Sequence, residues 1–523
     1  PSFGAARHAM ADPEDVKVAD AAPPPTVGPP LTFEEVRDLV EAASQNIALW
    51  LDDAEHGKGR YLVARRDIAV GEVVLQEEPL FRGGSDANQS RRAYESRFVQ
   101  LAQEGTEESF DEDFDEDCMH PRSPLVDCLA GILLAKREAL REDGPESPSR
   151  REAAALKVRK MVSLHRASVQ TPVPEDCAQE IEGVLLPELR ALTSLQEVQD
   201  FLHAMSSNRF GSADSKLDVM FAGSMFEHSC LPNCFVAGTW NADVKDKPRE
   251  YRALRDIKEG EALNIDYLGV PDSCLGAAQR AEKLAGWGFA CGCPRCATLP
   301  ELSRAFVCPT CGAPELCPER PGGARLVCRA CSGQADEAYA ARCLAVEAEL
   351  VRPIEPPAAA SAEAEASASA GGAAEAGPEA GAAPGAAPHP DENLVGRFHF
   401  VHLCVQWHEV NQGPDEEDEE DVSAYVAAVE AVVEGISRLY GQRLHPHMLE
   451  LYHLMAVVEA EDLDAQRVHL EREVEVLKRF YPEEAQAQED EVTWMMQQRG
   501  PPGSEPEPNP MFAGCYDVQD PDL

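Results

Sequence analysis

The stretch MFEHSCLPNCF, residues 225–235, brings together side chains that could do three kinds of chemistry. Glu227 and His228 can titrate, and Cys230 is a thiol that could bind a metal ion. Cys230 close to His228 also fits a thiol protease, but no second partner signature supports that function. His228 alone is typical of a buried, hydrogen-bonded histidine, and Asn233 of a tight turn. The stretch by itself leaves cofactor binding, metal binding and a purely structural turn open.

Two cysteine pairs farther along the chain have the spacing of metal ligands. Cys308-x2-Cys311 and Cys328-x2-Cys331 are separated by sixteen residues, which is zinc-ribbon spacing. Each pair can present two thiolates to one tetrahedral ion, and the spacer is long enough to return the chain. The alternative, four unrelated free thiols, is weaker, so we predict a structural zinc site here.

A second cluster, CGCPRC, supplies only the three thiolates of Cys291, Cys293 and Cys296. A closed structural zinc site needs four ligands, so the fourth must come from another segment. The nearest candidates are Cys230, Cys234 and Cys274. If one of them closes the site, the metal ties CGCPRC to its segment and builds one wall of a pocket. Structural zinc contributes on the order of 10 kcal/mol to small metal-dependent folds, so we expect the ion to order this region.

The composition narrows the class of protein. The chain has 523 residues and 44% hydrophobic side chains, enough for two to four domains with at least one sizeable core. Its 93 acidic and 47 basic residues leave a formal net charge of −46, which argues against general nucleic-acid binding and favours a basic substrate. No stretch approaches the ~20 apolar residues of a membrane helix, so we predict a soluble intracellular protein.

The segments around these motifs alternate between β and α patterns. Residues 32–51 show a short helical pattern, and residues 57–77 alternate apolar and polar side chains around a glycine turn. That turn, Arg-Asp-Ile followed by Gly-Glu at 66–72, returns at 255–261, although so short a pattern also arises by chance. We predict a β-hairpin at each turn, both in one sheet system.

Three longer regions have clear compositional or helical signals. Residues 121–205 repeat apolar side chains at three- and four-residue intervals, which predicts a helical insertion in the β domain. Residues 353–392 consist almost wholly of Ala, Gly, Pro, Glu and Ser, which predicts a flexible linker. Residues 394–485 again show helical spacing, which predicts a small α-domain of three or more amphipathic helices in antiparallel pairs.

Taken in order, HSCLPN (228–233), GEALNIDY (260–267) and FACGCPRC (289–296) resemble the SET-domain protein lysine methyltransferases. The wide split of the domain, the Cys-x-Cys-x2-Cys tail and the helical C-terminal region are most similar to the SET-and-MYND branch. The resemblance covers residues 47–300 well and 394–485 loosely.

Together with the patterns above, the resemblance implies an α+β protein. The expected fold is a split SET β-fold with a helical insertion, a zinc-bound post-SET segment, a zinc ribbon and a C-terminal α-helical, TPR-like domain. The expected divisions are a disordered N-terminus (1–30), the first SET part (31–83), the insertion (84–207), the second SET part (208–270), the post-SET zinc segment (271–300), the ribbon (301–335), the linker (353–392), the helical domain (394–485) and a disordered tail (486–523).

The resemblance also implies an activity, the transfer of methyl groups from S-adenosylmethionine (SAM) to a lysine side chain of a histone or non-histone protein. Tyr267 matches the catalytic tyrosine, Trp287 and Phe289 match substrate-channel aromatics, and Cys230 matches the fourth zinc ligand. The positions that match the family's cofactor-binding residues are Lys58, Gly59, Arg60, Asn208, Ser224, Glu227, His228, Tyr267 and Phe289.

Three departures from the family pattern affect what the resemblance implies. The family has Asn where this chain has Glu227, and a carboxylate cannot donate the hydrogen bond of an amide, which affects cofactor affinity. Trp287 replaces a second pocket tyrosine and has no hydroxyl for the amine, so the degree of methylation could shift. The MYND zinc finger is missing, because residues 84–207 hold only the cysteines Cys118, Cys128 and Cys177.

Three functions compete. The first is a SAM-dependent protein-lysine methyltransferase, and the second is a catalytically degenerate SET scaffold that binds partners, for which Glu227 is the best support. The third, a zinc-ribbon nucleic-acid protein, rests on a few ribbon arginines in a strongly acidic chain. We predict the first function, with SAM and two structural zinc ions as cofactors and a protein with a target lysine as substrate. We expect a monomer that binds no nucleic acid directly, associates with no membrane and resides in the nucleus, the cytoplasm or both.

Overall fold

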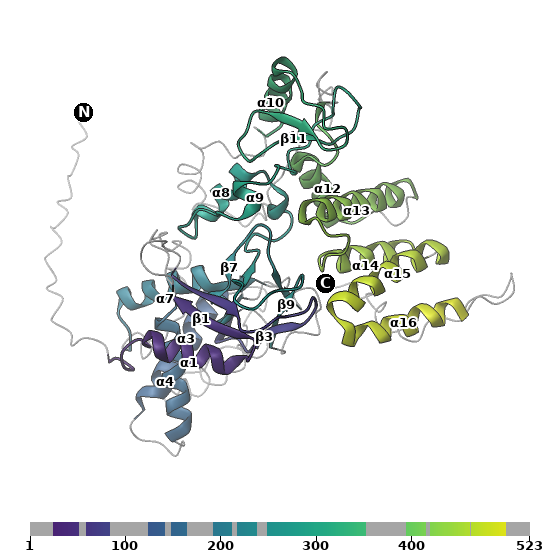
Figure 1. The fold of residues 1–523 in the computed structure, drawn as a ribbon. Helices are drawn as coiled ribbons and strands as arrows, with labels where there is room; N and C mark the ends of the chain where they lie inside the picture. Colours follow the sequence, from purple (N-terminus) through teal and green to yellow (C-terminus); the bar gives the residue numbers. More distant parts are fainter. Residues whose placement is uncertain are drawn as a thin grey trace, which may run out of the picture. The chain divides into compact units, whose positions relative to one another are not determined.

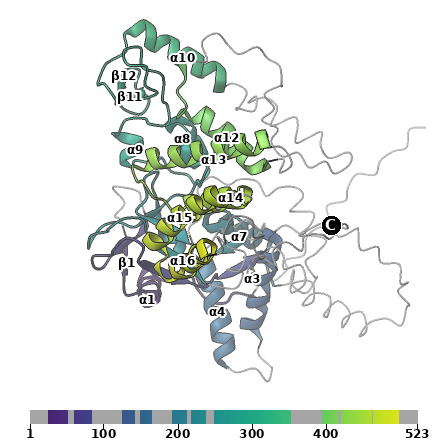
Figure 2. The ribbon, with the colours of Figure 1, turned by 90° about the vertical axis from the view of Figure 1, so that its right-hand side faces the viewer.

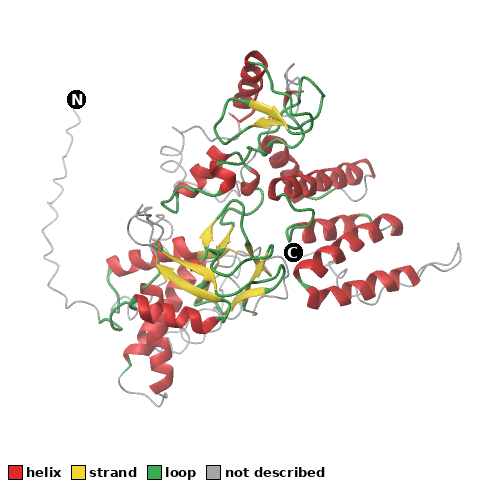
Figure 3. Ribbon diagram, viewed as in Figure 1, coloured by secondary structure: helices red, strands yellow, loops and turns green. Residues whose placement is uncertain are grey.

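The computed structural model describes the chain in ten segments, and they fall into two compact units (Figure 1; Figure 3). The described residues are 25–51, 59–83, 124–141, 148–164, 192–211, 217–237, 248–351, 394–414, 419–460 and 462–497. The predicted linker at 353–392 lies outside them, as do most of the predicted N-terminal and C-terminal disordered segments. None of the helices in these segments is long and apolar enough to span a bilayer.

The first unit combines residues 80–166 and 170–221 with the N-terminal residues up to Thr32. Its helices are α3 (Pro124–Leu140), α4 (Pro148–Val162) and α7 (Leu195–Asn208), and its strands are β4 (Phe81–Gly83), β5 (Arg209–Gly211) and β6 (Leu217–Val219). The strands form an antiparallel sheet in the order β4-β6-β5, and α3 packs against β4, β6, α4 and α7. The three helices lie almost wholly within the predicted insertion. The helical pattern near residues 181–189 lies outside the described residues.

The second unit carries the remaining strands of the β domain in several small sheets. Strand β1 (Ile47–Leu51) pairs with β2 (Arg60–Ala64), and β3 (Val73–Glu77), β9 (Arg249–Ala253) and β8 (Cys234–Ala237) form an antiparallel sheet in that order. Strand β7 (Glu227–His228) pairs in parallel with β10 (Asn264–Ile265). Helix α1 (Phe33–Ala43) packs on β1 and buries Val36 and Val40.

Two predictions for this region are wrong in part. The helical pattern predicted for 32–51 ends at Ala43, and residues 47–51 form β1. The strands on either side of each glycine turn exist, but they do not pair as hairpins: β2 pairs with β1, and β3 pairs with β9. Alternating polarity specifies that a segment is a strand, whereas its partner depends on long-range packing.

The repeated Arg-Asp-Ile…Gly-Glu turns nevertheless form a pair with local two-fold symmetry. The backbones of Ile68 and Ile257 exchange two hydrogen bonds, of 2.9 and 2.8 Å. The carboxylates of Asp67 and Asp256 each accept a backbone N–H from the opposite turn at 3.0 Å. Within each turn the arginine pairs with the glutamate that follows the glycine. The repeated pattern therefore marks two turns that bind each other.

A short, cysteine-rich region follows the β domain. It contains α8 (Ala277–Ala285), α9 (Pro294–Ala297) and the strand pair β11 (Leu316–Pro318) and β12 (Leu326–Cys328), which is followed by α10 (Glu337–Val351). A buried network joins the ribbon to the elements on either side of the linker. The Glu347 carboxylate of α10 accepts a hydrogen bond from Arg304 at 2.6 Å and lies 3.0 Å from Nε2 of His399, the residue that caps α12.

The C-terminal region is helical, with α12 (Phe400–Gln412), α13 (Glu419–Tyr440), α14 (Met448–Val458), α15 (Leu463–Phe480) and α16 (Pro482–Gln497) (Figure 2). Successive helices pack on each other, and most of their buried apolar residues join one cluster. Helix α16 extends beyond residue 485, so the first part of the predicted disordered tail is helical. Similarity to TPR repeats stays a prediction.

The helical region packs against the strands of the β domain. Phe235 of β8 contacts the rings of Phe480 and Tyr481, with centroids 5.7 and 5.8 Å apart. The buried Arg252 of β9 donates hydrogen bonds to the carbonyls of Phe480 (3.2 Å) and Gly71 (3.3 Å). A positive guanidinium is favourable at the negative C-terminal end of a helix, so Arg252 complements the end of α15.

Gly71 and Gly260 occupy equivalent turn positions but have different surroundings. Both have positive φ angles, +79° and +81°, which cost an L-residue roughly 1 kcal/mol. A Cβ on Gly71 would lie 2.3 Å from the carbonyl oxygen of Arg479, whereas one on Gly260 would meet no described atom within 4 Å.

We therefore expect Gly71→Ala to destabilise the protein more than Gly260→Ala. Gly260→Ala should lower the free energy of unfolding by about 1 kcal/mol, from backbone strain alone. Gly71→Ala adds overpacking against α15, typically about 1–3 kcal/mol. Urea unfolding of both variants measures the difference, and equal losses would show that the Gly71 turn does not pack against α15 in solution.

Candidate functional site

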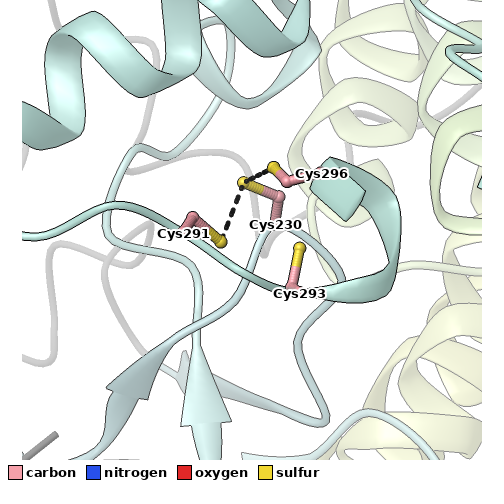
Figure 4. Close-up of side chains that lie close together, drawn as sticks. All are labelled: Cys230, Cys291, Cys293 and Cys296. Carbon is pink, nitrogen blue, oxygen red and sulfur yellow. Dashed lines mark hydrogen bonds between the residues drawn. The ribbon is translucent and has the colours of Figure 1, made fainter. Parts of the chain in front are cut away.

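Four sulfur atoms from two distant segments meet beside β7 (Figure 4). The sulfurs of Cys230, Cys291, Cys293 and Cys296 lie within 4.8 Å of one another, and Cys230 Sγ is 4.0 Å from Cys291 Sγ and 3.5 Å from Cys296 Sγ. A tetrahedral zinc ion with Zn–S bonds of about 2.3 Å requires sulfurs about 3.8 Å apart. The donor set and spacing therefore fit zinc. Of the three candidates for the fourth ligand, the fold brings Cys230 to the cluster.

The local backbone structure around these cysteines brings their thiols close together. Cys230 lies two residues after the end of β7, and Cys293 is the N-cap of the short helix α9, with Pro294 in its first turn. The backbone N–H of Cys296 donates to the Cys293 carbonyl at 2.9 Å, which closes a tight turn between these two thiols. Proline suits the first helical position because its missing N–H would have no helical partner there.

Two buried arginines contact the cysteines of this cluster, Arg280 at a sulfur and Arg295 at a backbone carbonyl. Arg280 of α8 is fully buried, and its Nη2 is 3.5 Å from Cys296 Sγ while its Nη1 is 3.5 Å from Glu301 Oε1. Arg295 donates to the Cys230 carbonyl at 3.3 Å. Burial lowers the pKa of Arg280, but Glu301 and the thiolates raise it by more. The net pKa therefore lies above its usual value, and the guanidinium stays charged. Four thiolates around Zn²⁺ carry a net charge of about −2, and two arginines neutralise it.

The imidazole of His228 connects this cysteine cluster to Tyr267. Its Nδ1 accepts the backbone N–H of Tyr267 at 3.1 Å, and its Nε2 lies 3.2 Å from Cys230 Sγ. An Nδ1 that accepts assigns the proton to Nε2, which therefore points at the sulfur. The side chain is fully buried, and burial lowers its pKa to about 4, so the ring is neutral at pH 7. The sequence indicated a buried, hydrogen-bonded histidine, but it did not predict these two partners of the ring.

Tyr267 lies among the two aromatic side chains that the sequence assigns to a substrate channel. Its ring centroid is 5.9 Å from that of Trp287 and 6.2 Å from that of Phe289, and the His228 ring is 5.2 Å away. Its hydroxyl donates to the Phe226 carbonyl. Burial and the negative charge of Glu227 raise the pKa of Tyr267, so it remains a phenol at neutral pH. Phe289 is 36% exposed, so the cluster presents an aromatic face to solvent.

The predicted cofactor residues are only partly brought together. Ser224 lies on the 3-10 turn Gly223–Met225, which ends two residues before Glu227. The Glu77 carboxylate holds this turn by accepting the N–H groups of Ala222 and Gly223 at 2.9 and 2.8 Å. A Cβ on Gly223 would lie 1.9 Å from the Tyr251 hydroxyl, so the turn requires glycine.

The other predicted cofactor residues come from other segments of the chain. Gly59, at φ +74°, precedes Arg60 at the start of β2, and no described atom lies within 4 Å of where its Cβ would be. An open position beside a glycine backbone suits the close approach of a ligand. Asn208 ends α7 in the first unit, where its amide donates to Ala204, and Lys58 lies outside the described residues.

Asn233 fastens the HSC segment to the strand that leads to Tyr267. Its backbone N–H donates to the Asn264 side chain at 3.0 Å, and the Asn264 N–H donates back to the Asn233 side chain at 2.9 Å. Its amide nitrogen also donates to the Ala262 carbonyl at 2.8 Å. The side chain is fully buried, so Asn233 serves the fold.

The zinc-ribbon cysteines form a second four-sulfur cluster. Cys308, Cys311, Cys328 and Cys331 have sulfurs within 4.8 Å of one another, with 3.7 Å between Cys308 and Cys331 and between Cys311 and Cys328. The separations again match the edge of a tetrahedral zinc–thiolate site. Cys317, between the two pairs, is buried and lies outside this cluster.

Arg280 and Arg295 were not predicted as site residues. Arg295 stands between the last two cysteines of CGCPRC, a position that could have suggested charge compensation. Arg280 lies in an ordinary amphipathic helix, and nothing local in the sequence distinguishes it.

Part of the chain is similar in sequence to known proteins. Residues 59–268 match the SET domain family. A SET and MYND domain-containing protein of Dictyostelium discoideum is 36% identical over 77 residues, 14% of this chain and 16% of that protein. The histone-lysine N-methyltransferase SET5 of Scheffersomyces stipitis is 32% identical over 104 residues, 20% of each chain. The chain thus matches only about a fifth of the length of these relatives.

A solved structure of Rubisco LSMT bound to AdoMet aligns over 88% of this chain and 93% of that one, at 13% identity and a TM-score of 0.29, too low to support an argument.

Because Arg280 neutralises the first cluster, we expect its replacement to loosen zinc there. Removing an outer partner of a zinc ligand typically costs about 10- to 100-fold in metal affinity. Wild-type protein should hold two zinc ions, and Arg280→Gln should release one of them to a chromogenic chelator at least tenfold faster, with Arg280→Lys between. Arg325→Gln, on the exposed part of the ribbon, is the control. Equal release rates for wild type and Arg280→Gln would remove the electrostatic role.

Proposed function

We propose, from the match of residues 59–268 to the SET domain family, that the chain is a SAM-dependent protein-lysine N-methyltransferase. The observation that carries the proposal is the position of Tyr267. Its ring contacts Trp287 and Phe289, its backbone is held by His228, and the aromatic pair directly precedes the cysteines that meet Cys230. The arrangement suits a narrow apolar site for a lysine side chain.

The chemistry requires a neutral lysine amine. A lysine with a pKa near 10.4 costs about 4.6 kcal/mol to neutralise at pH 7, at about 1.36 kcal/mol per pKa unit. Aromatic walls disfavour the ammonium form by desolvation, so Trp287 and Phe289 would lower this cost without a dedicated base. SAM, when bound, supplies a positively charged sulfonium with a transferable methyl group. Because the Tyr267 proton is used in the bond to Phe226, the oxygen lone pairs remain available to the polarised methyl group.

The substrate we propose is a basic protein segment that carries the target lysine, from a histone or another protein. The chain has a formal net charge of −46, which attracts basic segments at long range. The name of one relative, a histone-lysine N-methyltransferase, points in the same direction.

Tyr267→Phe tests the proposed mechanism. It removes only the hydroxyl, so we expect methyl transfer to fall at least about a hundredfold, the usual scale for losing a preorganised polar group at a reacting centre. The measurement is transfer from labelled SAM to basic proteins. Tyr339→Phe is a matched control, because it removes a hydroxyl that donates to a carbonyl, Val307, at 2.9 Å in the ribbon. Unchanged labelling by Tyr267→Phe would exclude the hydroxyl from the reaction.

A degenerate scaffold remains the second candidate because of Glu227. Its negative charge acts on Tyr267, and it replaces an amide that could donate a hydrogen bond. In such a scaffold the zinc clusters and helical region would serve partner binding alone.

Glu227→Asn separates the two candidates. We expect the variant to bind SAM about tenfold more tightly than wild type, a gain of about 1.4 kcal/mol, because the amide restores a donor. Calorimetry with SAM measures both proteins, with the exposed Glu259→Asn as control. Binding only by Glu227→Asn, with none by wild type at millimolar SAM, would favour the scaffold. A variant that binds more weakly would show that Glu227 itself serves SAM binding.

A further inference from the structure

Helix α13 ends at a tyrosine whose position is fixed by the helix end. Tyr440 is the last residue of α13, and Gly441 follows with φ +64°. The Gln442 N–H donates to the Ser437 carbonyl at 3.1 Å, a bond that closes the helix end in the manner of a Schellman motif. The Tyr440 ring stacks on His445, with centroids 4.3 Å apart and planes 24° apart. The orientation of the Tyr440 phenol is thus fixed by contacts within the helical region itself.

The Tyr440 hydroxyl donates to the residue that directly precedes Tyr267. It lies 3.1 Å from Asp266 Oδ2, and both side chains are nearly buried, with Tyr440 6% and the Asp266 side chain 9% exposed. The other oxygen, Oδ1, accepts the Leu268 N–H at 3.0 Å and lies 3.8 Å from His228 Nδ1. Burial raises the pKa of Asp266, and these hydrogen bonds oppose that rise.

Three consecutive residues are therefore held by polar contacts, and one of these contacts comes from the helical region. Asp266 is held by Tyr440, the Tyr267 N–H by the His228 ring, and the Leu268 N–H by Asp266. These contacts fix the backbone from which the Tyr267 ring projects, and the hydroxyl bond to Phe226 fixes the other end of the side chain. Tyr440 is the member of this set that comes from the helical region, which the SET family match does not reach.

We propose that Tyr440 is a positioning residue that fixes Tyr267 through Asp266, so that the C-terminal helical region forms part of the methyl-transfer site. The inference rests on the proposed function. A small displacement of a reacting group can cost about a hundredfold in rate, so one lost hydrogen bond next to Tyr267 acts on turnover more than on substrate affinity.

Tyr425 offers a matched comparison within the same helix. It is also 6% exposed, and its hydroxyl donates to a backbone carbonyl, that of Val410 at 3.4 Å. Tyr425 and Val410 both belong to the helical region, far along the chain from Tyr267. A purely structural role for tyrosine hydroxyls in α13 would make Tyr425→Phe and Tyr440→Phe behave alike.

The experiment compares Tyr440→Phe, Tyr425→Phe and wild type, in the full chain with zinc bound. We expect Tyr440→Phe to lower kcat about tenfold while KM for a basic protein substrate and Kd for SAM change less than twofold. Tyr425→Phe should keep the wild-type kcat, and the two variants should have similar Tm values. In an Asp266→Ala background, Tyr440→Phe should lower kcat no further.

Each alternative result has a distinct meaning. Equal kcat for Tyr440→Phe and Tyr425→Phe overturns the positioning role and leaves the proposed function intact. An effect of Tyr440→Phe that is confined to SAM affinity, or one that persists at full size with Asp266→Ala, overturns it also. A wild-type chain that binds SAM without transferring methyl groups, or binds none, overturns the proposed function and this role with it.

Discussion

The structure of the site depends on four sulfur atoms meeting at one point, although one of them comes from Cys230 and the others from a segment that begins at Cys291. Between these segments run β8, β9 and β10, so the contact closes a long loop of chain. Such closure is entropically unfavourable, and a tetrahedral metal–thiolate site is among the few local interactions strong enough to offset it. Because Trp287 and Phe289 stand just before Cys291, the contact that brings the four sulfurs together also places two rings against Tyr267.

Among the described residues, buried charged side chains of both signs occur. The chain is strongly acidic, yet its fully buried or nearly buried charges include the arginines Arg252, Arg280 and Arg295. Each lies where backbone carbonyls or thiolates concentrate negative charge: the end of α15, the Cys296 sulfur and the Cys230 carbonyl. A buried cation is tolerated only with such partners. The arginines therefore mark the three places where separate segments must join.

The sequence predicted best those features that local rules decide. The four-thiol requirement of zinc pointed to a missing ligand, and Cys230, one of three candidates, meets the cluster. Strand positions around the glycine turns followed from alternation, but their pairing did not, because β3 meets β9 across most of the β domain's length in sequence. The helical pattern of 394–485 appears in the fold, while its contact with Asp266 had no sequence signal, since a tyrosine at a helix end is ordinary. Contacts between polar residues that are far apart in the chain leave no periodic pattern in the sequence, so the sequence alone does not predict them.

The segment that matches the SET family is not a self-contained folding unit in this chain. Phe235, Arg252 and Asp266 all lie inside residues 59–268, and each is covered by the helical region. Without α13 and α15, one aromatic face would be exposed to water and two charged groups would lose partners, and leaving buried polar groups unpaired typically costs about 1–3 kcal/mol each. The backbone at Gly71 also shows close packing between the β domain and the helical region, because only a glycine lets this turn approach Arg479. The equivalent glycine of the other turn, Gly260, has no described atom within 4 Å of where its Cβ would be. The two otherwise similar turns therefore differ at the place where the helical region packs against the β domain.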